Sequence, residues 1–188
     1  MSHLRTVLWT HPTEPSNEYC VLSENEAGYQ FNGLVVMSQD TQPLRLEYQI
    51  VTSWDWRTQS VALTLQQATR EERMVLRVDA EQRWWRNDEE LTECRGCIDV
   101  DLSFSPATNT LPIRRMALNE GEHGDTITAW VQLPDLKIEP YPQRYTRTGF
   151  QEYLFESLND DFKARLLVDD LGLVMDYEGL WRATAQAS

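Results

Sequence analysis

The segment Cys97–Arg115, CIDVDLSFSPATNTLPIRR, holds the clearest pattern in the chain. Its first part, Ile98–Leu102, alternates apolar residues with Asp99 and Asp101. A period of two places alternate side chains on opposite faces of a strand, so the two carboxylates share one face and the apolar residues share the other. The segment therefore predicts a half-buried β-strand with both acids on the face opposite the apolar residues.

A polar turn is expected after this strand. Pro106 has no amide donor, and the run Ala107–Thr110 contains Thr and Asn residues whose side chains form local turns. The chain is then expected to resume as an extended segment at Leu111.

Two adjacent arginines follow the turn. On an extended backbone Arg114 and Arg115 point to opposite faces, and parity with Leu111 places Arg115 on the apolar side. A buried guanidinium without a partner is costly, so Asp99 or Asp101 is expected to pair with it. The alternatives for this arginine are an ion pair that locks the fold and a contact with a ligand.

Short alternating segments separated by turn signals make up most of the remaining chain. This pattern favours an all-β protein, an antiparallel β-roll or open barrel-like sheet with little helix. The strands expected lie at Leu4–Trp9, Tyr19–Ser23, Tyr29–Met37, Leu44–Ile50, Val61–Leu65, Met74–Val78, Arg83–Arg86 and Thr126–Leu133.

The segment Tyr153–Val168 supports two interpretations. Apolar residues recur there every four positions, as in a helix, but the same residues also fit two strands joined at Asn159–Asp161. We expect the two strands, followed by a hairpin turn at Asp169–Gly172. The last residues, Ala183–Ser188, are expected to form a frayed tail.

The central motif resembles the Putative glycolipid-binding family of small bacterial proteins. The similarity rests on the D-x-D strand followed by P-x-T-N-x-L-P-I-R-R, and it extends to other segments from Leu44, Arg83, Pro142 and Leu166 onward. The resemblance implies a β-roll that encloses an apolar cavity, similar to bacterial lipoprotein carriers, with a binding function. It also supports two strands over a helix in Tyr153–Val168.

Composition limits the partners. The 188 residues suit one domain spanning 1–188, and the net charge of -13 repels nucleic acid and anionic membrane surfaces. No apolar run is long enough to cross a bilayer. Three cysteines, an odd number, fit a reducing compartment, so a cytoplasmic location is expected. The oligomeric state stays open.

The acid pair has three possible roles. On a strand the Cα atoms of Asp99 and Asp101 lie roughly 6.5 to 7 Å apart, from a rise of about 3.3 Å per residue. This spacing suits a structural pair bound to Arg or turn amides, hydrogen bonds to a polar headgroup, or acid–base catalysis on a glycosidic bond.

Seven tryptophans are many for this length. Indole rings pack cores, and they also stack on sugar rings or contact acyl chains. Trp54 and Trp56, two residues apart, are expected to share a face, and with Trp84 and Tyr145 they are the aromatic candidates for a pocket.

Other motifs carry little chemistry. Cys94 and Cys97 have redox-motif spacing but precede a strand, and they lack a second pair for zinc. The histidines are scattered, and no nucleophile elbow occurs. No metal or cofactor is expected.

The sequence thus predicts a non-enzymatic module that binds a glycolipid or another amphiphile in the interior of the roll. The alternatives are a glycoside or glycolipid hydrolase that uses Asp99 and Asp101, and a structural or partner-binding protein in which the central motif is a folding lock. The candidate ligand-binding residues are Asp99, Asp101, Asn109, Arg114, Arg115, Trp54, Trp56, Trp84 and Tyr145.

Overall fold

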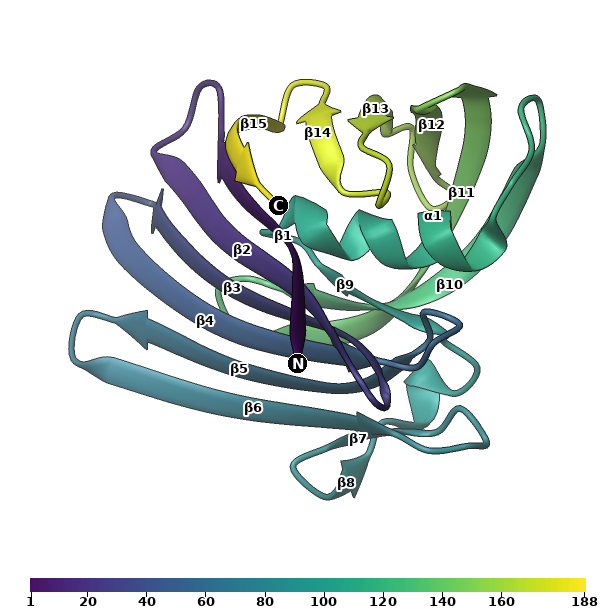
Figure 1. Cartoon of the computed structure of the whole chain (residues 1–188). Helices are drawn as coiled ribbons and strands as arrows, with labels where there is room; N and C mark the ends of the chain where they lie inside the picture. The colour runs from purple at the N-terminus through teal and green to yellow at the C-terminus, as the bar shows by residue number, and fades with distance from the viewer.

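The computed structural model of the chain describes residues 1–188 and consists mainly of strands (Figure 1). Two short 3-10 helices, η1 and η2, and one α-helix, α1, interrupt them between β8 and β10. The elements are β1 (Ser2–Thr10), β2 (Ser16–Asn25), β3 (Gly28–Gln39), β4 (Gln42–Thr52), β5 (Thr58–Gln67), β6 (Arg70–Val78), β7 (Trp84–Arg86), β8 (Glu89–Glu90), η1 (Thr92–Cys94), β9 (Asp99–Leu102), η2 (Pro106–Asn109), α1 (Thr110–Met116), β10 (His123–Gln132), β11 (Lys137–Gly149), β12 (Glu152–Ser157), β13 (Lys163–Val168), β14 (Val174–Tyr177) and β15 (Trp181–Ala187).

All fifteen strands belong to one curved sheet. Their order is β8-β7-β6-β5-β4-β3-β2-β1-β15-β14-β13-β12-β11-β10-β9, and every pair is antiparallel except β9 with β10. Because β8 and β9 lie at the two ends of this order and do not pair, the sheet is an open roll and not a closed barrel. The all-β roll predicted from the sequence is confirmed.

The segment Tyr153–Val168, which fitted either a helix or two strands, forms strands. β12 and β13 pair antiparallel on either side of Asn159–Asp161, and the chain turns at Asp169–Gly172 before β14 pairs with β13. The prediction of two strands and a hairpin is confirmed. A helix here would have left β11 without β12 and β14 without β13 in the sheet.

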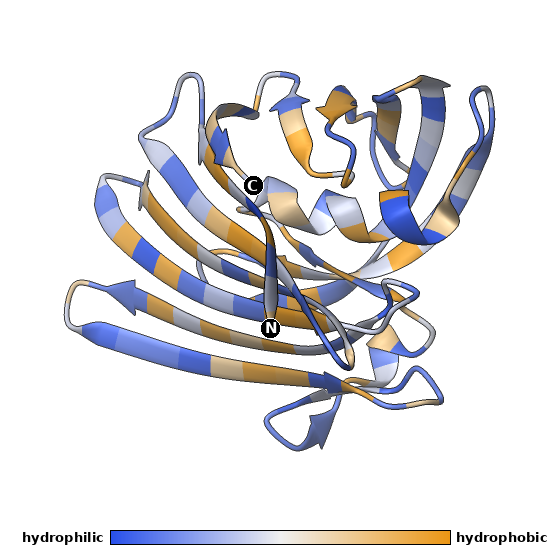
Figure 2. Ribbon diagram, in the orientation of Figure 1, coloured by the Kyte–Doolittle hydropathy of each residue, from blue (hydrophilic) through white to orange (hydrophobic).

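Alternation along the long strands builds the core. In β4 the buried residues are Leu44, Leu46, Tyr48 and Ile50, and the residues between them face outward. Figure 2 shows the resulting bands of apolar and polar residues along the curved strands. The buried side chains join in one cluster of 40 residues, which occupies the inside of the roll. The apolar interior expected as a ligand cavity is therefore largely filled.

One glycine in this core allows a side chain to cross a strand. Gly33 on β3 lies opposite Tyr48 in the sheet register, and the Tyr48 ring covers it so closely that a Cβ at Gly33 would lie 2.1 Å from the ring. The phenol thereby reaches over β3 to Glu18 on β2. Both residues are buried.

The segment after β9 is helical, so the predicted extended segment at Leu111 was wrong. Ser105 caps η2, since its Oγ accepts a hydrogen bond from Ala107 N at 3.1 Å, and Pro106 occupies the first helical turn, where a missing amide costs nothing. α1 follows directly and lies within the concave side of the sheet (Figure 1). Its buried residues Thr110–Ile113 fill space that a simple roll would leave open.

The end of the chain is ordered differently from the expected frayed tail. Residues 183–187 belong to β15, which pairs with β1 from Thr6 to Thr10, and Thr184 Oγ1 donates to Leu8 O at 3.2 Å. This pairing joins the two halves of the sheet, since β1 and β15 are neighbours in the strand order.

No helix in the structure has the length and apolar character needed to span a membrane.

Candidate functional site

Two adjoining cavities lie where β9, β10 and the β14–β15 connection meet. They measure about 350 and 620 Å³ and share the lining residues Ser103, Trp130, Leu180 and Trp181. We call the two together the aromatic groove. The smaller cavity is completed by Asp101, Leu102, Ser105, Asn109, Tyr141, Phe155, Asp160, Phe162 and Tyr177, and the larger by His11, Glu14, Ser16, Met37, Ser38, Gln39, Asp40, Phe104, Gln132 and Leu133.

Asp101 stands at the base of the smaller cavity in a network of neutral partners. Gln143 Nε2 donates to Asp101 Oδ2, and Tyr145 Oη donates to Gln143 Oε1 at 3.3 Å. Asn109 Nδ2 in turn donates to Tyr145 Oη at 2.9 Å. Burial raises the pKa of Asp101 to about 6, although the hydrogen bond from Gln143 opposes this shift. Three of the predicted site residues are thus brought together here.

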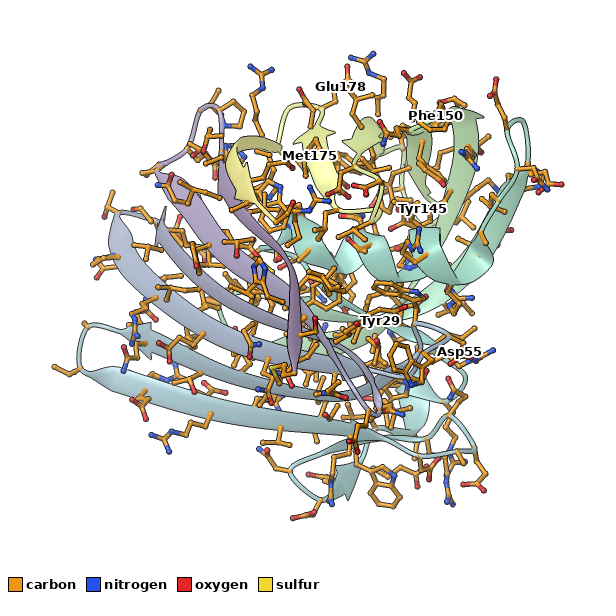
Figure 3. The ribbon with its side chains drawn as sticks, in the orientation of Figure 1. Tyr29, Asp55, Tyr145, Phe150, Met175 and Glu178 are labelled. Atoms are coloured by element: carbon orange, nitrogen blue, oxygen red, sulfur yellow. The ribbon has the colours of Figure 1, made fainter.

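Asp101 is the only charged residue of this hydrogen-bond network, and it also lines the cavity. Tyr145 is 1% exposed and supports Gln143 from behind. Figure 3 shows Tyr145 close to α1, well inside the molecule, whereas Phe150 and Glu178 lie at its outer rim. Tyr145 is therefore a positioning residue and not a surface of the pocket.

Aromatic rings form the walls of the groove. Trp130 stacks on Tyr141 with ring centroids 4.5 Å apart and an interplanar angle of 23°. Phe162 packs against Phe155 with centroids 5.9 Å apart. On the side of the larger cavity, Trp181 makes an edge contact with His11, with centroids 5.7 Å apart. Stacked and edge-on aromatic surfaces of this kind bind sugar rings and alkyl chains.

Asp99, two residues before Asp101, is sealed in a separate cluster. It is 0% exposed and bound to an arginine, which fits the structural role that was one of the three predicted for the acid pair. Arg115 on α1 donates two hydrogen bonds to the Asp99 carboxylate, from Nε to Oδ1 at 3.1 Å and from Nη2 to Oδ2 at 2.5 Å. Thr126 Oγ1 also donates to Oδ2 at 3.1 Å. The expected partnership of Arg115 with one of the two acids is confirmed.

β9 is covered on both sides, which explains the burial of Asp99. Val100 and Leu102 belong to the core, and Val100 N donates to Thr58 Oγ1 of β5 at 3.0 Å. The opposite face of β9 meets α1 through the Asp99–Arg115 pair. With Asp99 paired and only Asp101 lining the groove, the two carboxylates do not flank a common cavity as the hydrolase hypothesis requires.

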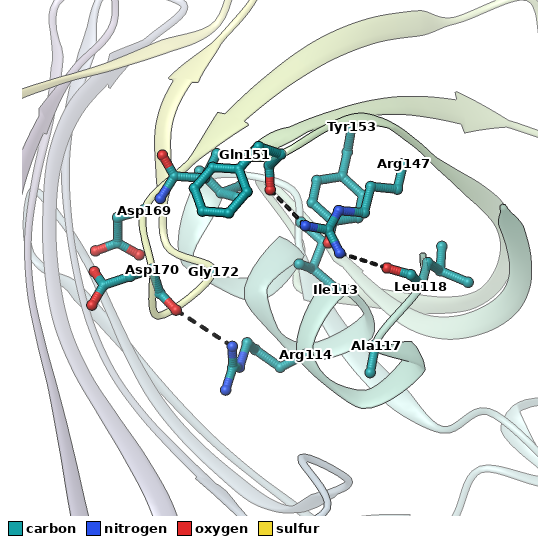
Figure 4. Close-up of a pocket in the computed structure, with 12 residues that line it drawn as sticks. Ile113, Arg114, Ala117, Leu118, Arg147, Gln151, Tyr153, Asp169, Asp170 and Gly172 are labelled. Carbon is teal, nitrogen blue, oxygen red and sulfur yellow. Dashed lines mark hydrogen bonds between the residues drawn. The ribbon is translucent and has the colours of Figure 1, made fainter. Parts of the chain in front are cut away.

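Arg114 points away from the groove and toward a different cavity of about 370 Å³ (Figure 4). Its Nη1 donates to Asp170 O at 3.4 Å, and its guanidinium carbon lies 5.5 Å from the centre of the Trp56 ring. In the same cavity the guanidinium of Arg147 donates to the carbonyls of Leu118 at 2.8 Å and Phe150 at 2.7 Å. Both arginines are engaged by the protein itself.

The predicted tryptophans lie outside the groove. Trp84 is fully buried and donates from Nε1 to Cys97 O at 2.8 Å. Trp54 and Trp56 were expected on one face, but Trp54 is 52% exposed and Trp56 is 6% exposed. The parity argument fails because Trp56 has a φ of 65° in the turn between β4 and β5, where the register shifts.

The aromatic residues that do line the groove were not selected from the sequence. They come from β10, β11, β12, β14, β15 and the β12–β13 turn, which are distant in the chain but adjacent in the sheet. One signal was available, since Trp130 is a large aromatic residue on the polar side of its own strand and pairs with Asp101 in the register of β9 and β10. The missed residues are Trp130, Tyr141, Phe155, Phe162, Tyr177 and Trp181.

A third acid, Glu18, contacts a residue that lines the groove. Glu18 is 0% exposed, and burial raises its pKa to about 8. It accepts hydrogen bonds from the hydroxyls of Tyr48 and, at 2.7 Å, of Ser105, which lines the smaller cavity. This contact ties the loop after β9 to strands β2 and β4.

The fold and this site together define an open β-roll protein with an aromatic, acidic groove. The chain belongs to the Putative glycolipid-binding family, whose model matches residues 6–183. A search of curated proteins gave no match.

A solved structure supports the same assignment. A crystal structure of a DUF1089 family protein from Pseudomonas aeruginosa shares 31% identity with this chain. The match covers 92% of this chain and 94% of that chain, with a TM-score of 0.82.

Proposed function

We propose that this protein binds an amphiphile, and specifically a glycolipid, in the aromatic groove. The observation that carries this proposal is the joining of two cavities, each lined by both apolar and polar residues, through a common wall of Trp130 and Trp181. The name of the family supports binding of this class of ligand.

The smaller cavity suits the polar headgroup. A sugar presents hydroxyl groups around its edge and C–H groups on its faces. Asp101 and Asn109 supply hydrogen-bonding groups for the edge, and the stacked rings of Trp130 and Tyr141 supply a surface for a face.

The larger cavity adds apolar surface for the rest of the ligand, beside polar residues such as Glu14, Gln39 and Asp40. Met37, Phe104, Leu133 and Leu180 line it together with Trp181. Burying apolar ligand surface here contributes roughly 25 cal/mol per Å² before the costs of association are counted. Because the filled core leaves no large apolar chamber, we propose this groove, and not the interior of the roll, as the binding site. The proposed location is the cytoplasm, in keeping with three unpaired cysteines.

The first experiment is native mass spectrometry of the purified protein, followed by solvent extraction of any bound molecule. An additional mass that extracts as an amphiphile is expected. A protein that is free of ligand and is not stabilised thermally by octyl glucoside would contradict the proposal, since a ligand specific for the folded state raises its melting temperature.

Matched tryptophan variants test the location. Trp130→Ala removes the wall shared by both cavities and is expected to weaken octyl glucoside binding about tenfold or more, the loss typical of one stacked aromatic. Trp54→Ala is the control, because Trp54 is exposed and lies outside the groove. Equal binding by both variants would place the ligand elsewhere.

A further inference from the structure

The charges that line the aromatic groove are all of one sign. Its two cavities carry Asp101 and Asp160 in the smaller and Glu14 and Asp40 in the larger, and no Lys or Arg lines either. His11 Nδ1 accepts hydrogen bonds from the amides of Thr13 and Glu14. A phosphate, sulfate or carboxylate headgroup would meet no lysine or arginine here.

Arg115, which pairs with the neighbouring acid Asp99, is already occupied. Arg115 gives both ends of its guanidinium to Asp99 and also donates to Thr126 Oγ1 at 2.9 Å. It lines neither cavity. Asp101 itself is held by an amide, Gln143, and not by a cation, so its charge is not neutralised within the protein.

The walls offer two further features of a ligand site. Tyr177 is 8% exposed and Trp181 is 6% exposed, and Tyr177 Oη and Trp181 Nε1 make no hydrogen bond within the protein. Neither atom is fully buried, so both remain accessible to a ligand. Both side chains line the smaller cavity, so a ligand hydroxyl can accept from them there.

From these observations we infer that the groove selects a headgroup bearing an amine, such as an amino sugar, over neutral and anionic headgroups, with Asp101 as the partner of the ammonium group. The inference rests on the proposed function and specifies its ligand class. Electron-rich faces of Trp130, Tyr141 and Trp181 attract a cation in addition to stacking on the ring. The hydroxyls of the same sugar satisfy Tyr177 and Trp181.

The groups that face Asp101 are consistent with this role. Asp99 lies behind it on β9 with its charge matched by Arg115, and the phenols of Tyr141, Tyr145 and Tyr177 surround it. Asp160 lines the same cavity and accepts a hydrogen bond from Tyr141 Oη at 3.3 Å. None of them competes with a ligand cation. Since burial raises the pKa of Asp101 to about 6, the carboxylate is charged at neutral pH and loses its charge in mild acid.

Three probes that share one ring and one chain test the inference: octyl glucoside, octyl 2-amino-2-deoxyglucoside and octyl glucuronide, titrated calorimetrically at pH 7. The amine is expected to bind about tenfold more tightly than the neutral glucoside, as for one hydrogen bond between charged groups. The glucuronide is expected to bind most weakly. The preference for the amine over the neutral probe should shrink at pH 5.

Asp101→Asn should abolish the preference while neutral octyl glucoside still binds, which also shows that the variant is folded. The matched control is Asp55→Asn, since Asp55 is an exposed acid in the β4–β5 turn, outside the groove (Figure 3). It should keep the preference. Equal or tighter binding of the neutral probe to the wild-type protein would overturn the charge inference alone, and failure of all three probes to bind would overturn the proposed function as well. A preference that survives in Asp101→Asn would remove Asp101 from the role.

Discussion

Asp99 and Asp101 lie two residues apart on one strand and face the same side of it, yet they occupy opposite environments. Asp99 is sealed and held by a guanidinium from α1. Asp101 is held by the neutral amide of Gln143 and borders a cavity. A carboxylate paired with a guanidinium is already neutralised and attracts a ligand cation weakly. A carboxylate that accepts a hydrogen bond only from a neutral amide keeps its net negative charge and attracts a cation more strongly. The comparison separates an acid held in an ion pair from the acid that we propose as a ligand contact.

The difference arises from what packs against β9. α1 crosses above Asp99 and brings Arg115 to it, while above Asp101 the chain leaves the aromatic groove open. The following predictions test this contrast and its extension to Glu18, in order of decreasing effect.

Replacing Arg115, the cation that pairs with buried Asp99, should have the largest effect on stability. Arg115→Met leaves the Asp99 carboxylate buried without its charged partner, which costs about 3–5 kcal/mol of unfolding free energy. Urea denaturation monitored by tryptophan fluorescence measures the loss. The double variant Asp99→Leu with Arg115→Met should recover most of it, because an apolar pair of similar volume leaves no charge uncompensated. A loss below about 1 kcal/mol in the single variant would show that the pair is not structural.

The second prediction concerns Glu18, whose pKa is raised from 4.5 to about 8. Between these values the folded protein holds a proton that the unfolded chain has released, so raising the pH through this window lowers the free energy of unfolding. The loss between pH 5 and pH 8 should be smaller in Glu18→Gln than in the wild type by about 2–4 kcal/mol. Glu26→Gln, at an exposed glutamate, is the control. Parallel pH profiles for the wild type and Glu18→Gln would contradict the prediction.

Asp101→Asn should stabilise the protein at pH 7.5. The pKa of Asp101 is raised from 3.8 to about 6, so above pH 6 the folded state carries a charge that burial disfavours, and stability falls as the pH rises from about 4 to 6. The amide removes this cost, for an expected gain of about 1–2 kcal/mol at pH 7.5 that vanishes near pH 4. Denaturation at the two pH values measures it. Destabilisation at pH 7.5 would instead support the folding-lock hypothesis.

Arg114 provides the smallest expected effect and a direct comparison with Arg115. It is exposed, donates to one carbonyl and lies over Trp56. Arg114→Met should therefore cost less than about 1 kcal/mol, the usual value of an exposed cation–π contact. A loss similar to that of Arg115→Met would contradict this prediction, because the two arginines would then contribute equally to stability despite their different environments.

Several features of the fold could be predicted because they depend on local patterns. Alternation along Leu44–Ile50 and its counterparts fixed which faces of the strands are apolar, and the resulting strands built the predicted roll. Parity also placed Asp99 and Asp101 on a common face. The cost of an unpaired buried charge led to an Asp partner for Arg115.

The helix after β9 could have been recognised and was not. Ser105 followed by Pro106 is a common start of a helix, but Pro106 and the residues after it were interpreted as a turn that leads into an extended segment. This one error changed the expected direction of Arg114. On a helix two adjacent arginines point about 100° apart, which lets Arg115 reach Asp99 while Arg114 reaches Trp56.

The sequence by itself determined the class of fold, the faces of the long strands and the pairing of Arg115, because each follows from periodicity or from the cost of an isolated charge. Only the tertiary structure decided which acid is sealed, which is open, and which aromatic rings surround it. Trp130, Tyr141 and Trp181 come together because neighbouring strands of the curved sheet bring distant residues side by side. Burial depends on what packs across from a residue, and alternation along one strand carries no information about that partner.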